Sequence, residues 1–339
     1  MHEAQLYTGN PDGTTDCRLC NHRCHIADGR AGKCGVRQNR GGVLYSASYA
    51  RVSAENVDPI EKKPLNHFLP GTLCYSLGSV GCNFTCEHCQ NWQLSRAGDA
   101  VDSLPELPPD DAVKRAAASG CASVSWTYNE PTMTFEYTMD MGRLAREAGL
   151  GTVYVTNGFM TEEAVDALAP MLNAFRVDLK SFDDGFYRKV CGARLEPVLA
   201  STERAREVGM HVETVTLVIP GLNDSPEETD ALVRWVVEHL GPDTPMHFTR
   251  FHPDYRMRDR PATPVRLLER IYERAKELGL RYPYLGNVGG HKYENTWCPV
   301  CNNLLIERTL MQGRVRGLDE GRCRQCGEAI PVVRSVPLP

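Results

Sequence analysis

The sequence predicts an α/β fold, a partial (β/α)6 TIM-like barrel with a small cysteine-rich module at each end of the chain. Three observations lead to this prediction. Six short apolar, β-branched runs alternate with longer amphipathic segments, a polar motif follows each run, and cysteines gather near both termini. We expect an N-terminal Cys-rich metal module in residues 1–45, the barrel in residues 46–290, and a C-terminal zinc ribbon in residues 291–339.

The six apolar runs are the expected strands of the barrel, and amphipathic segments between them are the expected helices. The runs occupy residues 73–78, 123–128, 152–157, 174–180, 212–220 and 246–251. The helical segment 110–120 opens with Asp110 or Asp111 as the expected N-cap and closes on a glycine. The segment 225–241 opens with Ser225, which a proline follows, and also closes on a glycine.

Length, charge and composition describe an ordinary globular protein. The 339 residues are 42% hydrophobic and 24% charged, which is enough apolar content for a large core. A net charge of −5 argues against the broad basic surface that nucleic acids or anionic membranes attract. The chain has no long apolar stretch and no basic or apolar N-terminal region, so we expect no membrane span, no signal peptide and a cytoplasmic location.

The polar motifs that follow the runs predict one functional face. In chain order they read GCNFTCEHC, NEPT, TNGF, DLKS, IPGLND and FHPDY. Because the carboxyl ends of parallel strands lie on one side of a barrel or open sheet, these six motifs should converge there. Glycine and proline at any single strand end could be simple turn formers, but six such motifs with carboxylates, amides and thiols indicate an active site.

The first of these motifs contains three cysteines, Cys82, Cys86 and Cys89, with the spacing CxxxCxxC. Three thiolates on a four-iron cubane leave one iron without a protein ligand, so that iron can bind an exchangeable molecule. The alternative is a tetrahedral zinc that is bound by the three cysteines and by water or His88. In a chain of this length without an export signal, the fourteen cysteines indicate metal or catalytic roles rather than disulfides.

Two cysteine quartets flank this triplet. The C-terminal quartet has two CxxC pairs separated by 21 residues, a spacing that predicts a structural zinc ribbon with a short hairpin in the spacer: Cys298, Cys301, Cys323 and Cys326. A redox dithiol or a rubredoxin-like iron site are the alternatives. The N-terminal quartet fits either zinc or a second iron-sulfur cluster, with His22 and His25 as substitute ligands, and a loop of reduced thiols without metal is the remaining alternative: Cys17, Cys20, Cys24 and Cys34.

The CxxxCxxC triplet resembles the radical S-adenosylmethionine superfamily, and the resemblance covers nearly the whole central region. It implies a [4Fe-4S] cluster on Cys82, Cys86 and Cys89, the catalytic residues, with S-adenosylmethionine on the open iron. Reductive cleavage of that cofactor would give methionine and a 5'-deoxyadenosyl radical that abstracts hydrogen from a substrate. His88 matches the aromatic position that packs near the adenine in this superfamily.

The other motifs are similar to those of the pyruvate formate-lyase activating enzyme and, more closely, to the radical SAM enzyme of the AmmeMemoRadiSam system. The resemblance implies contacts with the amino group, the methionyl carboxylate, the adenine and the ribose of the cofactor, from Asn129, Glu130, Thr156, Asn157, Asp178, Lys180, Pro220 and His252. Lys180 would be the cation for the carboxylate, with Asp178 as its partner. The plain alternatives are that Asp178 and Lys180 neutralise each other and that His252 is a structural hydrogen bonder.

The resemblance to the AmmeMemoRadiSam enzyme also rests on the segment 58–72 and on both flanking cysteine modules. It implies Memo-like and AMMECR-like protein partners, and the chemistry implies an electron donor such as a flavodoxin or a ferredoxin. The pair Lys62 and Lys63 in that segment is either a solvated turn or a site for a substrate anion.

Three hypotheses about function follow. The first is a radical SAM enzyme that acts on an unknown substrate. The second keeps that chemistry and makes the substrate a glycyl-radical enzyme, whose glycine loop must reach the barrel. The third is a non-catalytic metal or redox sensor, or a ribbon that binds nucleic acid. The six arginines and four acidic residues in 298–339 give the nucleic-acid hypothesis little support.

Overall fold

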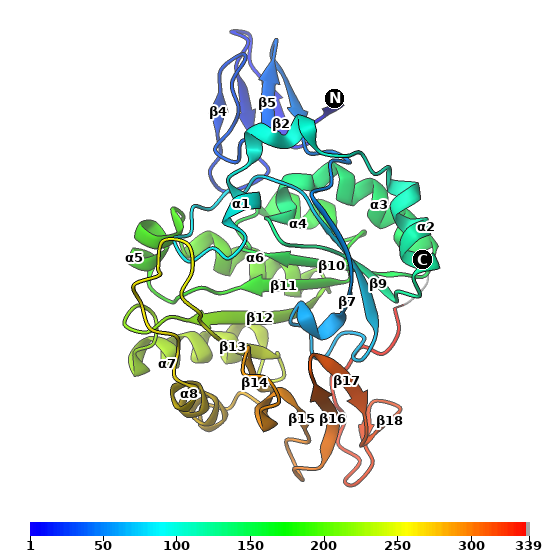
Figure 1. The fold of residues 1–339 in the computed structure, drawn as a ribbon, viewed down its shortest axis with the longest axis vertical. Coiled ribbons are helices and arrows are strands. Elements are labelled where there is room, and N and C mark those ends of the chain that lie inside the picture. The colour runs from blue at the N-terminus through cyan, green and yellow to red at the C-terminus, as the bar shows by residue number, and fades with distance from the viewer. Residues whose placement is uncertain (337–339) are drawn as a thin grey trace.

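A central sheet of eight strands runs through the middle of the molecule (Figure 1). The computed structural model describes residues 1–336. Strands β8 to β14 are parallel and follow one another in order, and β7 pairs antiparallel with β8 at one edge. The strands are β7 (Ala54–Pro59), β8 (Leu73–Gly78), β9 (Ser123–Trp126), β10 (Gly151–Thr156), β11 (Ala174–Asp178), β12 (His211–Val218), β13 (Met246–Arg250) and β14 (Pro283–Gly286).

The six predicted runs all form strands, β8 to β13, with bounds that differ by no more than two residues from those predicted. Two strands were missed. β7 contains three polar residues and a proline, and β14 is a four-residue strand that begins with a proline, so neither has the apolar pattern of a strand. The sheet is therefore wider than the six-stranded one that was predicted, and among the described residues its edge strands β7 and β14 do not pair with each other.

Helices connect the parallel strands, and the longer ones pack on the outer face of the sheet (Figure 1), whereas the short helix α1 lies in the loop after β8. They are α1 (Trp92–Ser95), α2 (Pro109–Ala118), α3 (Phe135–Glu147), α4 (Glu162–Leu168), α5 (Asp184–Phe186), α6 (Glu196–Glu207), α7 (Pro226–Trp235) and α8 (Val265–Glu277). None of the helices in residues 1–336 has the length and apolar character needed to cross a membrane.

The caps of two helices test the predicted boundaries. The side chain of Ser225 accepts a hydrogen bond from the backbone N–H of Glu228 at the start of α7, so this N-cap is confirmed. The predicted caps Asp110 and Asp111 are wrong, because α2 already begins at Pro109, whose fixed φ suits the first helical position. Both aspartates instead lie in the first turn, where a negative charge favours the helix dipole.

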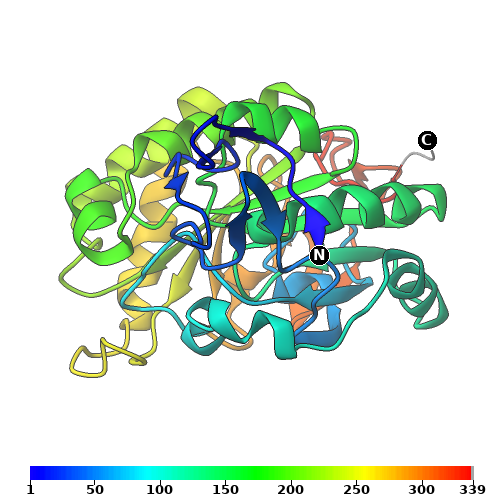
Figure 2. The ribbon, with the colours of Figure 1, turned by 90° about the horizontal axis from the view of Figure 1, so that it is seen from above.

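The N-terminal segment forms two small three-stranded sheets at one end of the molecule (Figure 1). Their strands are β1 (His2–Glu3), β2 (Tyr7–Gly9), β3 (Thr15–Cys17), β4 (His25–Ile26), β5 (Arg37–Arg40) and β6 (Val43–Ser46). Seen from above, this segment lies over the body of the molecule (Figure 2). Its buried side chains, Leu19 and Ile26 among them, belong to the same hydrophobic core as the central sheet.

The C-terminal segment forms a compact ribbon at the opposite end (Figure 1). Its strands are β15 (Thr296–Trp297), β16 (Leu304–Thr309), β17 (Gln312–Val315), β18 (Leu318–Asp319) and β19 (Arg322–Cys323). β16 and β17 form the predicted hairpin, with Leu310 and Met311 at positive φ in its turn. The ribbon has its own small core, which includes Tyr284 of β14 and so joins the ribbon to the edge of the sheet.

Candidate active site

The cysteine triplet lies on the loop that follows β8, residues 79–91. Gly81 has a φ of 85°, and a Cβ at this position would lie 2.7 Å from the carbonyl oxygen of Cys34, so both the turn and the close approach require glycine. The side chain of Asn129 holds the loop on both sides: it accepts from the backbone N–H of Ser79 at 3.0 Å and donates to the carbonyl of Gly81 at 3.0 Å. Both atoms of its amide are therefore used to position the loop.

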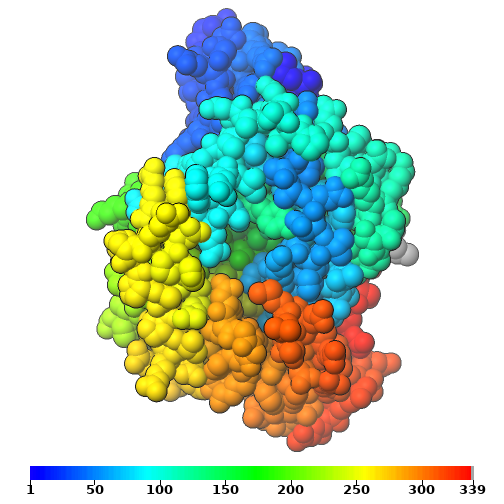
Figure 3. All heavy atoms as spheres, viewed as in Figure 1, coloured from blue at the N-terminus to red at the C-terminus, as the bar shows by residue number. Residues whose placement is uncertain are grey.

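The three cysteines line one cavity of about 440 Å³ on the inner face of the sheet. Figure 3 shows this cavity as the hollow in the middle of the face. The ends of β9, β10, β11, β12 and β13 and the residue after β14 also contribute to its wall, through Thr127, Val155, Thr156, Asp178, Leu217, Thr249 and Asn287. The strand ends thus converge on the triplet, as the order of the motifs predicted.

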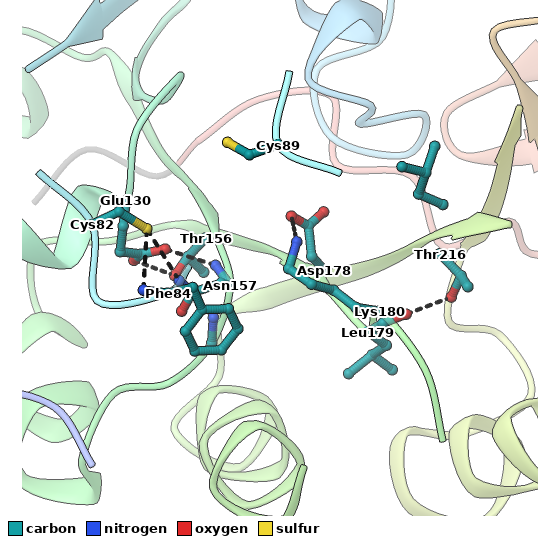
Figure 4. A network of polar contacts seen from close by, with 12 residues as sticks. Cys82, Phe84, Cys89, Glu130, Thr156, Asn157, Asp178, Leu179, Lys180 and Thr216 are labelled. Atoms are coloured by element: carbon teal, nitrogen blue, oxygen red, sulfur yellow. Dashed lines mark hydrogen bonds and ion pairs between the residues drawn. The ribbon is translucent and has the colours of Figure 1, made fainter. Parts of the chain in front are cut away.

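Glu130 lies beside Cys82 at one side of the cavity (Figure 4). Its carboxylate is 3% exposed and accepts hydrogen bonds from the hydroxyls of Thr132 at 2.5 Å and Thr156 at 2.6 Å and from the backbone N–H of Asn157 at 2.8 Å. Burial raises the pKa of Glu130, although these donors favour the ionised form. Among residues 1–336 no lysine, arginine or histidine forms an ion pair with this carboxylate, so Glu130 is a buried acid without a cationic partner.

Asn157 connects this group to the triplet loop. Its side-chain N–H donates to Asn83 at 2.7 Å and approaches the sulfur of Cys82 at 3.9 Å, and its side-chain oxygen accepts from the backbone N–H of Phe159 at 3.1 Å. Thr156 and Asn157 hold the carboxylate of Glu130, and Asn157 also contacts Asn83 and Cys82. The end of β10 therefore fixes the carboxylate of Glu130 and the sulfur of Cys82 relative to each other.

Asp178, Lys180 and Arg176 form a charged row on the other side of the cavity. They alternate along β11 and its continuation, so they point to one face. The carboxylate of Asp178 accepts from Arg176 at 2.5 Å. It also accepts from Lys180 at 2.9 Å, a contact that Figure 4 shows. Burial opposes ionisation of Asp178, but the two cations outweigh it and lower its pKa to about 2. Two cations thus share one anion, which leaves one positive charge in excess at this wall; Arg176 was not among the predicted site residues.

A second group with an excess positive charge lies at the rim. The carboxylate of Asp58 accepts from Lys62 at 2.8 Å, from Lys63 at 2.7 Å and from the hydroxyl of Tyr128 at 2.9 Å. Lys62, Lys63 and Tyr128 line the cavity. The side chain of Lys63 is 3% exposed, so the interpretation of this lysine as part of a solvated turn is wrong. Burial lowers the pKa of Lys63, and the hydrogen bond to Asp58 opposes this shift.

His88 lines the cavity between Cys86 and Cys89. Burial lowers its pKa to about 3, so the imidazole is neutral at physiological pH. The sulfurs of Cys86 and Cys191 and one ring nitrogen of His88 all lie within 4.8 Å of one another. Cys191 ends the π-helical segment Tyr187–Cys191 and was not predicted to be a site residue; the sequence offered no signal for it, because it stands outside every cysteine cluster.

Two predicted contacts do not lie on the cavity. β12 ends at Val218 and β13 at Arg250, so the chain has already turned away when it reaches Pro220 and His252. The carbonyl of Pro220 accepts from Arg260, and His252 is exposed to solvent. Leu217 and Thr249, the last inward side chains of the two strands, occupy the wall instead.

The two quartets differ in geometry. In the ribbon, one sulfur each of Cys298, Cys301, Cys323 and Cys326 lies within 4.8 Å of all the others, with 3.5 Å between Cys298 and Cys326. The N-terminal cysteines line a small separate cavity. His22 faces this cavity but its Nε2 is in a 2.7 Å hydrogen bond with the carbonyl of Asn83, and His25 is exposed and paired with Asp16.

Comparisons with known proteins are consistent with this geometry. The model of the "Radical SAM superfamily" matches residues 77–233. The chain is 43% identical to the uncharacterized protein MJ0808 of Methanocaldococcus jannaschii, over 98% of this chain and all of that protein. It is 27% identical to the benzylsuccinate synthase activating enzyme of Thauera aromatica, over 44% of each chain. Among solved structures, Streptococcus suis SuiB matches 67% of this chain and 52% of its own with a TM-score of 0.50 at 17% identity, a likeness of fold alone.

Proposed function

The chain belongs to the radical SAM superfamily, and we propose that its cavity binds S-adenosylmethionine next to a [4Fe-4S] cluster held by Cys82, Cys86 and Cys89. When bound and reduced, this cluster supplies the electron that splits the sulfonium into methionine and a 5'-deoxyadenosyl radical, which takes a hydrogen atom from the substrate. Three thiols on one loop, which line one cavity, fit a four-iron cluster with an open corner.

The distribution of charge in the cavity is the observation that carries the proposal. A buried carboxylate without a cationic partner, Glu130, lies on the side of Cys82, and a wall with excess positive charge, Lys180 and Arg176 around Asp178, lies on the other. The methionyl part of the cofactor carries an ammonium and a carboxylate on one carbon. Its ammonium complements Glu130 and its carboxylate complements Lys180, so the cavity has the charge pattern of a zwitterion site.

The other residues position these groups. Asn129 and Asn157 hold the cysteine loop through its backbone and through Asn83, so they act on the cluster site without a free amide group for the cofactor. The neutral imidazole of His88 provides an uncharged surface beside the triplet for the adenine. Apolar walls from Val155, Val215 and Leu217 limit access of water to the floor of the cavity.

The main test is cleavage of the cofactor. After anaerobic reconstitution with iron and sulfide, reduction and addition of S-adenosylmethionine, chromatography should detect 5'-deoxyadenosine. Cys86→Ala should abolish it, whereas Cys121→Ala, which removes a buried thiol at the start of β9 and away from the cavity, should leave it unchanged. Absence of 5'-deoxyadenosine with every low-potential reductant, or equal formation by Cys86→Ala, would contradict the proposal.

A second test addresses the charge pattern. Glu130→Gln keeps the shape of the side chain and removes its charge, so the dissociation constant of S-adenosylmethionine should rise roughly tenfold to hundredfold, the value of one charge-assisted hydrogen bond. Glu163 is exposed and forms an ion pair with Arg23, so Glu163→Gln is the matched control and should bind S-adenosylmethionine with the affinity of the wild type. Iron per chain must be unchanged in both variants; equal affinity with full iron content would exclude Glu130 as the ammonium partner.

A glycyl-radical enzyme is the second candidate for the substrate. The similarity to the benzylsuccinate synthase activating enzyme of Thauera aromatica favours it. In this case the deoxyadenosyl radical would abstract hydrogen from a glycine of the partner protein. Mixing the reduced enzyme and S-adenosylmethionine with such a partner should leave a stable organic radical signal in electron paramagnetic resonance. The third hypothesis, a non-catalytic sensor, does not agree with membership of a superfamily of enzymes.

We also propose that the ribbon binds one zinc ion. A tetrahedral zinc with Zn–S bonds of about 2.3 Å has sulfurs about 3.8 Å apart, and the ribbon sulfurs lie at 3.5 and 3.6 Å in their close pairs. One zinc per chain that Cys298→Ala removes would support this assignment. Memo-like and AMMECR-like partners and the AmmeMemoRadiSam system complete the proposal and rest on the sequence motifs. A flavodoxin or ferredoxin donor is proposed because the cleavage of the cofactor needs an electron.

A further inference from the structure

The N-terminal quartet encloses a space of its own. Cys17 ends β3, Cys24 precedes β4, and Cys20 and Cys34 lie in the adjoining loops, so that all four line one small cavity. Leu19, Ile26 and Met133 supply apolar side chains to the same wall. The four sulfurs therefore share one enclosed, largely apolar site although the chain between them has little regular structure.

The separation of the sulfurs distinguishes this site from the ribbon. In the ribbon all four sulfurs are mutually within 4.8 Å, the spacing that one tetrahedral ion requires. Across residues 1–336, no three of the N-terminal cysteines meet that distance, and the same holds for the triplet of Cys82, Cys86 and Cys89. The sulfurs of the N-terminal quartet thus lie further apart than those of the ribbon, at a spacing that suits a cuboidal cluster better than a single tetrahedral ion.

A buried arginine gives an independent sign of a missing hydrogen-bond acceptor. Arg37 is 1% exposed and lines the cavity of the quartet. One of its terminal nitrogens donates to Glu136 at 2.9 Å and the other to the carbonyl of Gln5, but its Nε has no hydrogen-bond partner in the described structure. A buried N–H is rarely left unpaired, so a group with acceptor atoms is expected beside it.

From these observations we propose that Cys17, Cys20, Cys24 and Cys34 bind a second [4Fe-4S] cluster in which every iron has a protein ligand. A cuboidal cluster that carries sulfide acceptors accounts both for the sulfur spacing and for the unpaired N–H of Arg37. A single zinc would require the four sulfurs to close to about 3.8 Å, whereas a cuboidal cluster holds its thiolates further apart.

The position of this site suggests its role. Asn83, the residue after Cys82, lines the N-terminal cavity, and its carbonyl bonds to His22 of the N-terminal segment. Asn83 therefore lies between the two cysteine sites, next to Cys82 in the sequence and in the wall of the N-terminal cavity. Cys24 and Cys34 are partly exposed. One electron from a donor of the ferredoxin or flavodoxin class would enter the N-terminal cluster and pass to the triplet cluster, with no change of ligands or protons. This role rests on the proposed function; the presence of the cluster does not.

The cluster is tested by metal analysis of anaerobically reconstituted protein. The wild type should contain about eight irons and eight sulfides per chain, and a triple variant with Cys82→Ala, Cys86→Ala and Cys89→Ala should keep about four of each. The complementary variant Cys17→Ala/Cys34→Ala should also keep about four, with circular dichroism as the check of folding. A triple variant without iron and sulfide but with a second zinc besides that of the ribbon would overturn the proposal.

The electron-transfer role has a separate test. With titanium(III) citrate, a small reductant, Cys17→Ala/Cys34→Ala should still form 5'-deoxyadenosine. With reduced flavodoxin as the donor, its rate should fall at least tenfold below that of the wild type. Equal rates with flavodoxin would overturn the relay and leave the cluster in place. Loss of product with both reductants, in a variant that keeps the triplet iron, would also count against the relay, because it would place the defect in the chemistry itself.

Discussion

The buried carboxylate of Glu213, on β12, is held by a network of hydrogen bonds whose loss should lower the free energy of unfolding. Its two oxygens accept four hydrogen bonds, from the backbone N–H groups of Asn66 and His67 and from the imidazoles of His211 and His247, at 2.7 to 2.9 Å. The side chain is fully buried. Burial opposes ionisation, but the histidines outweigh it and hold the pKa of Glu213 well below its usual range.

Glu213→Gln replaces one of these oxygens by an amide N–H that faces two donors. Two hydrogen bonds to a charged acceptor are lost, each with a value of about 1.5–3 kcal/mol, so the free energy of unfolding should fall by about 3–6 kcal/mol. This is a large part of the 5–15 kcal/mol that is typical of native proteins. With a urea dependence of about 3 kcal/mol per molar, the midpoint of unfolding should move down by 1–2 M.

The assay is urea unfolding monitored by circular dichroism and tryptophan fluorescence. Glu147→Gln is the matched control, because this glutamate is exposed on α3 and pairs with Arg143 alone, an interaction of about 0.5 kcal/mol or less. A Glu213→Gln variant within 1 kcal/mol of the wild type would refute the reasoning, since it would mean that the four donors find other acceptors.

Three further predictions concern other parts of the fold. Burial lowers the pKa of His67 from 6.5 to about 3, so between these pH values only the unfolded chain takes up a proton on this residue. The free energy of unfolding should therefore fall as the pH decreases, by about 2 kcal/mol at pH 5. Urea titrations at several pH values should show a smaller pH dependence for His67→Gln than for the wild type. Ser225→Ala removes the N-cap of α7 and should cost about 1 kcal/mol in the same assay, and an unchanged midpoint would contradict the assigned cap. Gly81→Ala should lower the iron content per chain, because the added Cβ would clash with the carbonyl oxygen of Cys34. Gly120→Ala is the control, because Gly120 also has a positive φ but has open space around it. Equal loss of iron in both variants would show that backbone strain alone is responsible.

The fold could be predicted where hydrophobic patterning is strong. Strands β8 to β13 are buried between helices and the cavity, so their apolar runs stand out in the sequence. β7 and β14 are edge strands, and their polar and proline-containing sequences obtain regular structure from pairing with a neighbour. The tertiary context determines the structure of such segments, and no local sequence pattern indicates it.

The site could be predicted where a motif ends a strand. Glu130 and Lys180, which were predicted as cofactor contacts, line the cavity because parallel topology brings strand ends together. Arg176 could have been found from its period-two spacing with Asp178 and Lys180. Pro220 and His252 do not line the cavity, because β12 and β13 end two residues before them, and the position at which a strand ends depends on packing.

The ribbon also contacts the loop between β7 and β8, in part through the segment that follows its last cysteine. Val333 exchanges backbone hydrogen bonds with His67 and Leu69, and Arg308 of the hairpin donates to the carbonyl of Asn66. These contacts hold the loop between β7 and β8, in which Lys62 and Lys63 line the cavity. Loss of the zinc ion proposed for the ribbon should therefore loosen this loop, and limited proteolysis should detect the change first as cleavage between residues 60 and 72.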